Sequence, residues 1–190
     1  MKYGADAVAG WLIRCGAVEE EDRELYVYAV KSLLTTIAPL LIAGLAGVLM
    51  GYWKHGILLI LLFMCMRKYS GGFHAKHAWA CLLMSVLLLV PAIWCAAHIS
   101  CGIGLLLVTA AALISLMVFS PVDSENKRLD TQEKKHYRKI VIWIGGFFGL
   151  VCLASYCLGW QTITVSIAIG LILSAGLQMP CVVIKKMTTR

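Results

Sequence analysis

The residues with the clearest chemical potential lie together in one short stretch of the chain. It holds two imidazoles and one thiol, His74, His77 and Cys81, directly after the pair Gly71 and Gly72. A cysteine nucleophile works as a thiolate, and a nearby imidazole can accept the thiol's proton and later return it. This stretch therefore indicates a cysteine–histidine pair for acyl transfer.

Helical spacing and the glycine pair favour different histidines. In one unbroken helix His74 and Cys81, seven residues apart, would be separated by about 10.5 Å along the axis, too far for a hydrogen bond. His77 precedes the thiol by four residues and faces it on a helix without any bend. The glycines permit a sharp turn that folds His74 back over the next helix. Helical spacing by itself favours His77 as the partner of Cys81, and the glycine turn keeps His74 as the alternative partner.

Two other interpretations stay open on residue types alone. A cysteine in an apolar helix is commonly inert packing, and a histidine near a membrane surface is commonly an amphipathic anchor. His74, His77 and Cys81 are also of the types that bind zinc, but no carboxylate lies near them in sequence to complete the shell. We expect no metal and no cofactor, and the lack of an H-E-x-x-H motif argues against a zinc metalloprotease.

The elements that carry this stretch are predicted to be membrane-spanning helices. Of the 190 residues, 61% are hydrophobic and 14% are charged, whereas a soluble domain has about 25% charged residues. Long runs carry no charge, and that much exposed apolar surface would aggregate in water. The N-terminus lacks the apolar core and cleavage site of a signal peptide. We predict an all-α, polytopic integral membrane bundle that keeps its first span.

Six apolar runs are candidate transmembrane helices, because a span needs about 20 apolar residues. The weakest, Gly56–Met66, has only 11 residues and is expected to be short or re-entrant. The other five are Leu33–Tyr52, Trp79–His98, Cys101–Phe119, Ile140–Trp160 and Ile163–Ile184.

Basic residues predict the orientation of this bundle. With six crossings and the N-terminus inside, 16 of the 17 Lys and Arg residues lie on the cytoplasmic side, and only Lys54 does not. This is the bias that the positive-inside rule describes. Both termini are then cytoplasmic, and the cytoplasmic segments are 1–32, 67–78, 120–139 and the basic tail 185–190.

The whole chain, 1–190, is predicted to be one membrane domain, with its bundle at 33–184. Segment 1–32 is predicted to carry an amphipathic helix on the inner surface, because its apolar residues repeat at helical spacing. A soluble helical extension is the alternative for this segment.

Three patches of the sequence resemble one known family. The pattern R-K-Y-S-G-G-F-H-A-x(5)-C, with Ser85 one turn after the cysteine, is similar to the signature of the accessory gene regulator B (AgrB) family. The segments EEEDRELYVYAVKSLL and SPVDSENKRL are similar to family segments in the expected order and at the expected spacing. Members of this family are integral membrane cysteine endopeptidases that process quorum-sensing peptide precursors in Gram-positive bacteria.

The resemblance implies that His74 and Cys81, and not His77, form the catalytic pair. It implies a substrate that is a short precursor peptide with an amphipathic leader and an acidic tail. The thiolate would release the tail and form a thioester, which a Cys or Ser of the peptide would convert into a thiolactone or lactone. The family also suggests a bacterial cytoplasmic membrane, contact with membrane lipid and a homodimer, and no nucleic-acid partner is expected.

Further residues on the predicted cytoplasmic side are assigned supporting roles. Backbone N–H groups near Gly71 and Gly72 suit an oxyanion pocket, and Ser85 can support the thiolate. Asp123 can orient His74, with a turn-forming role as the alternative. A group of basic side chains suits an acidic peptide tail, with membrane topology and anionic lipid as the alternative. The group consists of Arg67, Lys68, Lys127, Arg128, Lys134 and Lys135.

The competing function is non-enzymatic, either a small membrane transporter or a lipid-binding helical bundle. Transport sites usually have ionisable residues or broken helices at mid-membrane. The six predicted spans contain no Asp, Glu, Lys or Arg. This composition disfavours a transporter for a charged substrate.

Overall fold

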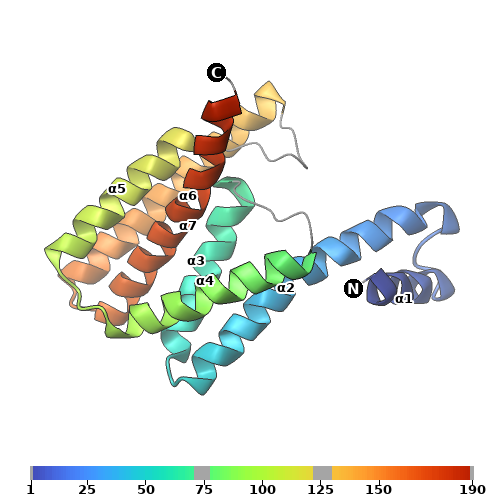
Figure 1. Ribbon diagram of the computed structural model, residues 1–190, viewed down its shortest axis with the longest axis horizontal. Coiled ribbons are helices and arrows are strands. Elements are labelled where there is room, and N and C mark those ends of the chain that lie inside the picture. The colour runs from blue at the N-terminus through green and yellow to red at the C-terminus, as the bar shows by residue number, and fades with distance from the viewer. Residues whose placement is uncertain (1, 71–77, 122–129, 189–190) are drawn as a thin grey trace.

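The computed structural model describes residues 2–70, 78–121 and 130–188, and all regular structure in these ranges is helical (Figure 1). The predicted all-α class is therefore confirmed for the described residues. The elements, in chain order, are α1 (Lys2–Arg14), the 3-10 helix η1 (Glu20–Asp22), α2 (Arg23–Leu49), α3 (Trp53–Ser70), α4 (Ala78–His98), α5 (Ile103–Phe119), α6 (Thr131–Cys157) and α7 (Gln161–Thr188).

Glycine-ended turns reverse the chain after α2 and after α6. Gly51 and Gly159 have φ values of 78° and 74°, a left-handed conformation that glycine adopts without a side-chain clash. The next residue in each case, Tyr52 or Trp160, donates its N–H at 2.8 Å to a carbonyl five residues earlier. This is the hydrogen-bond pattern of the Schellman motif, which closes a helix end. The following helices, α3 and α7, therefore start within a few residues and run back.

From α2 to α7 the helices run in alternating directions (Figure 1). The ends of α3 and α7 and the start of α6 lie together at what we call the basic end, residues 67–70, 130–139 and 181–188. The starts of α3 and α7 and the end of α6 lie at what we call the opposite end, residues 49–57 and 157–163. Helix α1 packs on α2, away from the bundle.

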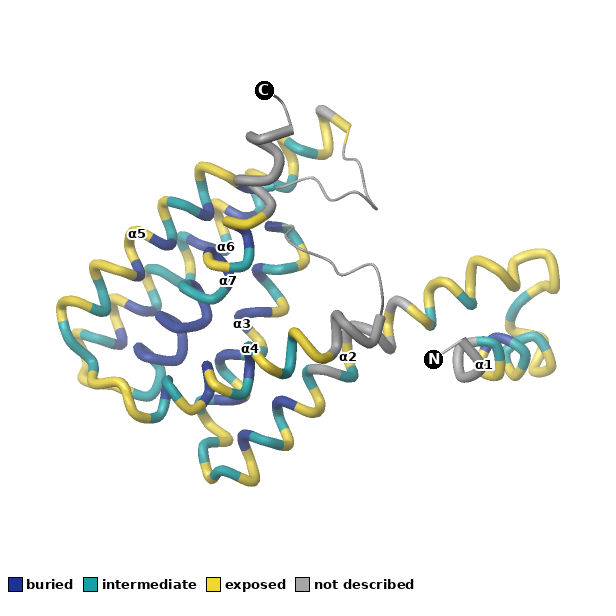
Figure 2. Tube along the Cα trace, viewed as in Figure 1, coloured by how far each residue is buried: buried dark blue, intermediate teal, exposed yellow. Residues whose placement is uncertain are grey.

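Two apolar clusters form the core, and α3 and α7 contribute to both. One cluster joins them to α5 and α6 around Leu62, Leu116 and Leu171. The other joins them to α2 and α4 around Leu59 and Ile93. Figure 2 shows the buried residues gathered on the faces where these helices meet. Helices α3 and α7 are therefore the central pair of the bundle.

The central pair approaches closely at Gly170 of α7. A Cβ atom built at this glycine would lie 2.8 Å from Cδ2 of Leu62 and 3.7 Å from its Cβ. Leu62 is fully buried, with a relative exposure of 0%. Because a close-packed interior offers little room for a side chain to move, the small residue sets the spacing of α3 and α7.

Two helices in the described part of the chain are long and apolar enough to cross a membrane, α6 over Gln132–Cys157 and α7 over Gln161–Pro180. They overlap the predicted spans Ile140–Trp160 and Ile163–Ile184. The other predicted crossings stay predictions, although three of them contain shorter apolar helices, Leu40–Leu49, Leu83–His98 and Ile103–Phe119.

The helices extend beyond the apolar runs from which they were predicted. The run Gly56–Met66 lies inside α3, whose 18 residues make a helix of roughly 27 Å at 1.5 Å per residue. The helix is longer than the apolar run, but α3 is not among the helices apolar enough to cross a membrane, so the expectation of a short or re-entrant segment stays a prediction. In segment 1–32, α1 ends at Arg14 and α2 begins at Arg23, and the short helix η1 lies in the acidic stretch between them.

The contact at Gly170 predicts a position-specific loss of stability. Gly170→Val should lower the free energy of unfolding by about 1–3 kcal/mol, because the added methyl groups overpack the space beside Leu62. Thermal unfolding of the detergent-purified protein measures this. The matched control is Gly176→Val on the same helix, where a Cβ would meet nothing within 4 Å. Equal losses in both variants would contradict the assigned packing.

Candidate functional site

The predicted catalytic stretch falls at the junction of α3 and α4. Helix α3 ends at Ser70, immediately before the glycine pair, and α4 begins at Ala78. The connecting segment 71–77 lies outside the described residues, and with it Gly71, Gly72, His74 and His77.

Cys81 is the fourth residue of α4 and so belongs to the first turn of this helix. The N-terminus of a helix carries partial positive charge and stabilises an anion placed there. Ser85 follows one turn later on the same helix and is half-buried. Whether His74 reaches Cys81 stays a prediction, because the imidazole lies outside the described residues.

Aromatic contact brings the basic ends of α3 and α6 together. The rings of Tyr69 and Tyr137 lie 6.0 Å apart between centroids. Lys68, next to the first tyrosine, is exposed and holds its ammonium 5.3 Å from the centroid of that ring. Lys134 and Lys135 lie less than one turn before Tyr137 on α6. Three of the predicted tail-binding lysines are therefore carried by neighbouring helix ends, whereas α4 begins to one side of them (Figure 1).

The basic residues of α3 and α6 differ in their local energetics. Arg67 and Lys68 lie in the last turn of α3, where positive charge is favourable to the helix dipole. Lys134 and Lys135 lie at the start of α6, where positive charge is unfavourable. Glu133 partly offsets this by accepting a 3.1 Å hydrogen bond from the Asp130 backbone N–H.

Arg67 is held against its own helix, with the guanidinium carbon 5.6 Å from the centroid of the Phe63 ring. This cation–π contact leaves the arginine half-buried at the basic end. Three further predicted site residues lie outside the described part of the chain, namely Asp123, Lys127 and Arg128.

Sequence reasoning did not single out Gln178, a buried amide of α7 near the basic end. Gln178 of α7 is 1% exposed and donates from Nε2 to Ser120 Oγ, 3.0 Å away, at the end of α5. Its Oε1 has no hydrogen-bond partner within the described residues. The bond ties α7 to the start of the connection 120–139 that carries the predicted basic loop. A lone amide within the apolar run Ile163–Ile184 was the available signal.

The outer surface of α6 is apolar and uncovered. Trp143, Phe147 and Leu150, which follow at helical spacing, are 79%, 61% and 69% exposed. Only 22% of the apolar window of α6 is buried, against 61% for α7. A soluble protein would not leave such a surface to water. The helical fold and the two candidate spans thus indicate a helical membrane protein.

The sequence profile of the accessory gene regulator B (AgrB) family matches residues 5–181. The chain therefore belongs to the AgrB family, which acts in accessory gene regulation and quorum sensing and is associated with autoinducer peptide processing.

Individual relatives agree with this assignment. An AgrB-like protein of Clostridium perfringens strain SM101 is 24% identical over 174 residues, which is 84% of this chain and 80% of the relative. Accessory gene regulator protein B of Staphylococcus carnosus strain TM300 is 23% identical over 121 residues, 63% of this chain and 61% of the relative. No solved structure matches the chain significantly.

The hydrogen bond between Gln178 and Ser120 predicts a measurable coupling. Ser120→Ala should lower the free energy of unfolding by about 1–3 kcal/mol, because it leaves a buried amide without a partner. Adding Gln178→Leu should recover part of that loss. Ser174→Ala is the control for removing a buried hydroxyl. Among the described residues this hydroxyl donates a hydrogen bond to the Gly170 carbonyl of its own helix, so its loss leaves no buried amide without a partner. Strictly additive losses in the double variant would contradict the coupling.

Proposed function

We propose that this protein is a membrane-embedded cysteine peptidase that removes the acidic tail of a short precursor peptide and prepares the remainder for cyclisation. The observation that carries the proposal is the family match over residues 5–181, which includes the G-G-x-H-A block and its downstream cysteine. A cysteine nucleophile at this position would work as an anion.

The chemistry consists of two acyl transfers. His74 accepts the proton of the Cys81 thiol, and the thiolate attacks the carbonyl carbon of the peptide bond before the tail. The C–N bond breaks, the imidazolium returns its proton to the leaving amine, and the acyl group remains on Cys81 as a thioester. A thiol or hydroxyl of the peptide then attacks this thioester. His74, neutral again, accepts the proton of this thiol or hydroxyl, the bond to Cys81 breaks, and the ring closes as a thiolactone or lactone. The Cys81 thiolate is thereby regenerated beside the imidazolium.

The thioester has to be protected from water until the ring closes. Transfer to another thiol exchanges one thioester for another, whereas hydrolysis is strongly downhill and ends the cycle. A site at the boundary of lipid and water restricts access of water to the intermediate. A catalytic site at the membrane surface would therefore favour cyclisation over simple hydrolysis of the thioester.

The basic end suits the acidic tail of the substrate. Lys68 and Lys135 are exposed, and Lys134 lies beside the latter on α6. Their side chains add positive potential where α3 and α6 meet, which attracts a negatively charged segment and orients it. Asp123, Lys127 and Arg128 are proposed to act with them from the connection between α5 and α6.

We further propose six membrane crossings with the basic end in the cytoplasm. The alternating helix directions (Figure 1) support this arrangement, and so do the 18 residues of α3. The thiol of Cys81 then faces a reducing compartment, where it stays available for catalysis.

The topology predicts which ends of the helices a membrane-impermeant thiol reagent reaches in intact cells. In a variant without native cysteines, Gln161→Cys should be labelled from outside, because the opposite end faces away from the cytoplasm. Lys135→Cys should be labelled only after permeabilisation. Labelling of both positions in intact cells, or the reverse order, would contradict the six-crossing arrangement.

The catalytic assignment predicts a simple variant series. The protein is coexpressed with a short peptide that carries an internal Cys or Ser and an acidic tail, and tail release is followed by mass spectrometry. Cys81→Ala and His74→Ala should abolish release, since each removes one partner of the proton transfer. Cys157→Ala, an exposed cysteine at the opposite end, is the matched control and should keep full release.

His77 provides the sharpest contrast in the same series. Release should persist in His77→Ala. Loss of release in His77→Ala together with full release in His74→Ala would overturn the pair, and release that survives Cys81→Ala would overturn the thiol mechanism itself.

A further inference from the structure

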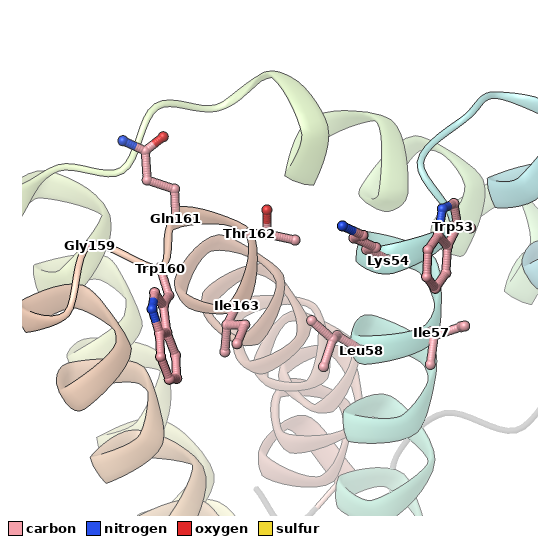
Figure 3. Close-up of a pocket in the computed structure, with 9 residues that line it drawn as sticks. All are labelled: Trp53, Lys54, Ile57, Leu58, Gly159, Trp160, Gln161, Thr162 and Ile163. Atoms are coloured by element: carbon pink, nitrogen blue, oxygen red, sulfur yellow. The ribbon is translucent and has the colours of Figure 1, made fainter.

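An open cavity of about 690 Å³ lies at the opposite end of the bundle. It lies between the first turns of α3 and the turn that joins α6 to α7 (Figure 3). Its volume is within the range of about 300–1,000 Å³ that is typical of small-molecule sites. The proposed peptidase chemistry assigns no role to this cavity.

The walls of the cavity are fixed by the fold. Gly159 lines it and begins the reversal into α7, so the left-handed turn at this glycine sets the position of Trp160. His55 follows Lys54 on α3, and its Nδ1 lies 3.0 Å from Ser166 Oγ, a hydrogen bond between α3 and α7. The two helices that form the walls are thus tied together.

The cavity has an apolar floor and a polar rim. Ile57, Leu58 and Ile163 form the floor, and Figure 3 shows Leu58 and Ile163 facing each other across it. At the rim, Lys54 extends from α3 toward Thr162 of α7 (Figure 3). An occupant with one anionic and one apolar part fits this division.

Among the described residues, charge at this end of the molecule comes from Lys54. The segments 32–66, 79–122 and 140–184 contain a single charged side chain, Lys54, and no Asp or Glu. Its ammonium lies 5.6 Å from the centroid of the Trp53 ring, a cation–π contact that leaves the charge without an acidic counterpart. An anion at the rim would therefore meet one uncompensated positive charge and no competing carboxylate.

Two tryptophans flank the opening. Trp53 and Trp160 line opposite sides of the cavity (Figure 3) and are 51% and 57% exposed. Tryptophan is enriched at the level of lipid headgroups, because its ring is apolar and its N–H is polar. The cavity mouth therefore lies at the level of headgroups if the bundle crosses the membrane along its helices.

We propose that this cavity binds one anionic phospholipid of the leaflet opposite the basic end. The phosphate contacts Lys54 and the Thr162 hydroxyl, and an acyl chain lies over Ile57, Leu58 and Ile163. The apolar floor distinguishes this ligand from a free phosphate ion, which would leave the floor uncovered. The acidic peptide tail of the proposed substrate belongs to the other end, where the basic residues gather.

Native mass spectrometry of the detergent-purified full chain tests this proposal with added phosphatidylglycerol. Wild type should retain one lipid, and Lys54→Gln should retain it about fivefold more weakly, which corresponds to the loss of one lysine near an anionic headgroup. Lys54→Arg keeps the positive charge and should retain the lipid as strongly as wild type. Thr162→Phe should also weaken it by filling the rim. Lys139→Gln, an exposed lysine at the basic end, is the matched control and should leave retention unchanged.

Two comparisons decide between ligands. Phosphatidylcholine should bind more weakly than phosphatidylglycerol to wild type, and inorganic phosphate should not displace the lipid. Equal retention in wild type and Lys54→Gln would overturn the proposal, as would full displacement by phosphate. Lipid retention and release of the peptide tail are separate measurements. Failure of the lipid proposal is therefore distinguishable from failure of the peptidase proposal.

Discussion

The packing of α3 against α7 is the constraint on which the rest of the structure depends. Leu62 fits against Gly170 at a distance that leaves no room for a Cβ, and both apolar clusters of the core include residues of these two helices. A hydrogen bond from His55 to Ser166 joins the same helices near the opposite end. Because α3 leads directly into the predicted catalytic stretch, the central pair also determines where that stretch begins.

The two ends of this pair have different chemistry. At the basic end, the contact between Tyr69 and Tyr137 gathers lysines of α3 and α6, and the bond from Gln178 to Ser120 fixes the start of the following connection. At the opposite end, one lysine and two tryptophans surround an apolar cavity. The sides between the ends expose large apolar residues, as a helical protein surrounded by lipid requires.

Sequence reasoning predicted the existence of the helices better than their ends. Hydropathy detects the apolar run Gly56–Met66, but backbone hydrogen bonds continue α3 through polar residues on both sides, up to Ser70. The predicted catalytic stretch rests on its glycines, histidine and cysteine, and helical spacing by itself favours His77, so the choice of His74 depends on the family resemblance. The cavity could not be predicted, because Lys54 and Trp160 are far apart in sequence and only the pairing of α3 with α7 brings their helices together. Gln178 acquires its partner by the same kind of long-range contact.

The central claim is that Cys81 carries the acyl group of the substrate, and the most direct measurement is the mass of the enzyme during turnover. The protein is mixed with a precursor peptide whose internal Cys or Ser has been replaced by Ala, so that ring closure is blocked, and the reaction is stopped with acid. We predict a mass increase equal to the peptide without its tail, located by fragmentation on Cys81 and removed by hydroxylamine, as expected of a thioester. Tail release without any adduct on Cys81, or an adduct on another residue, would contradict the account.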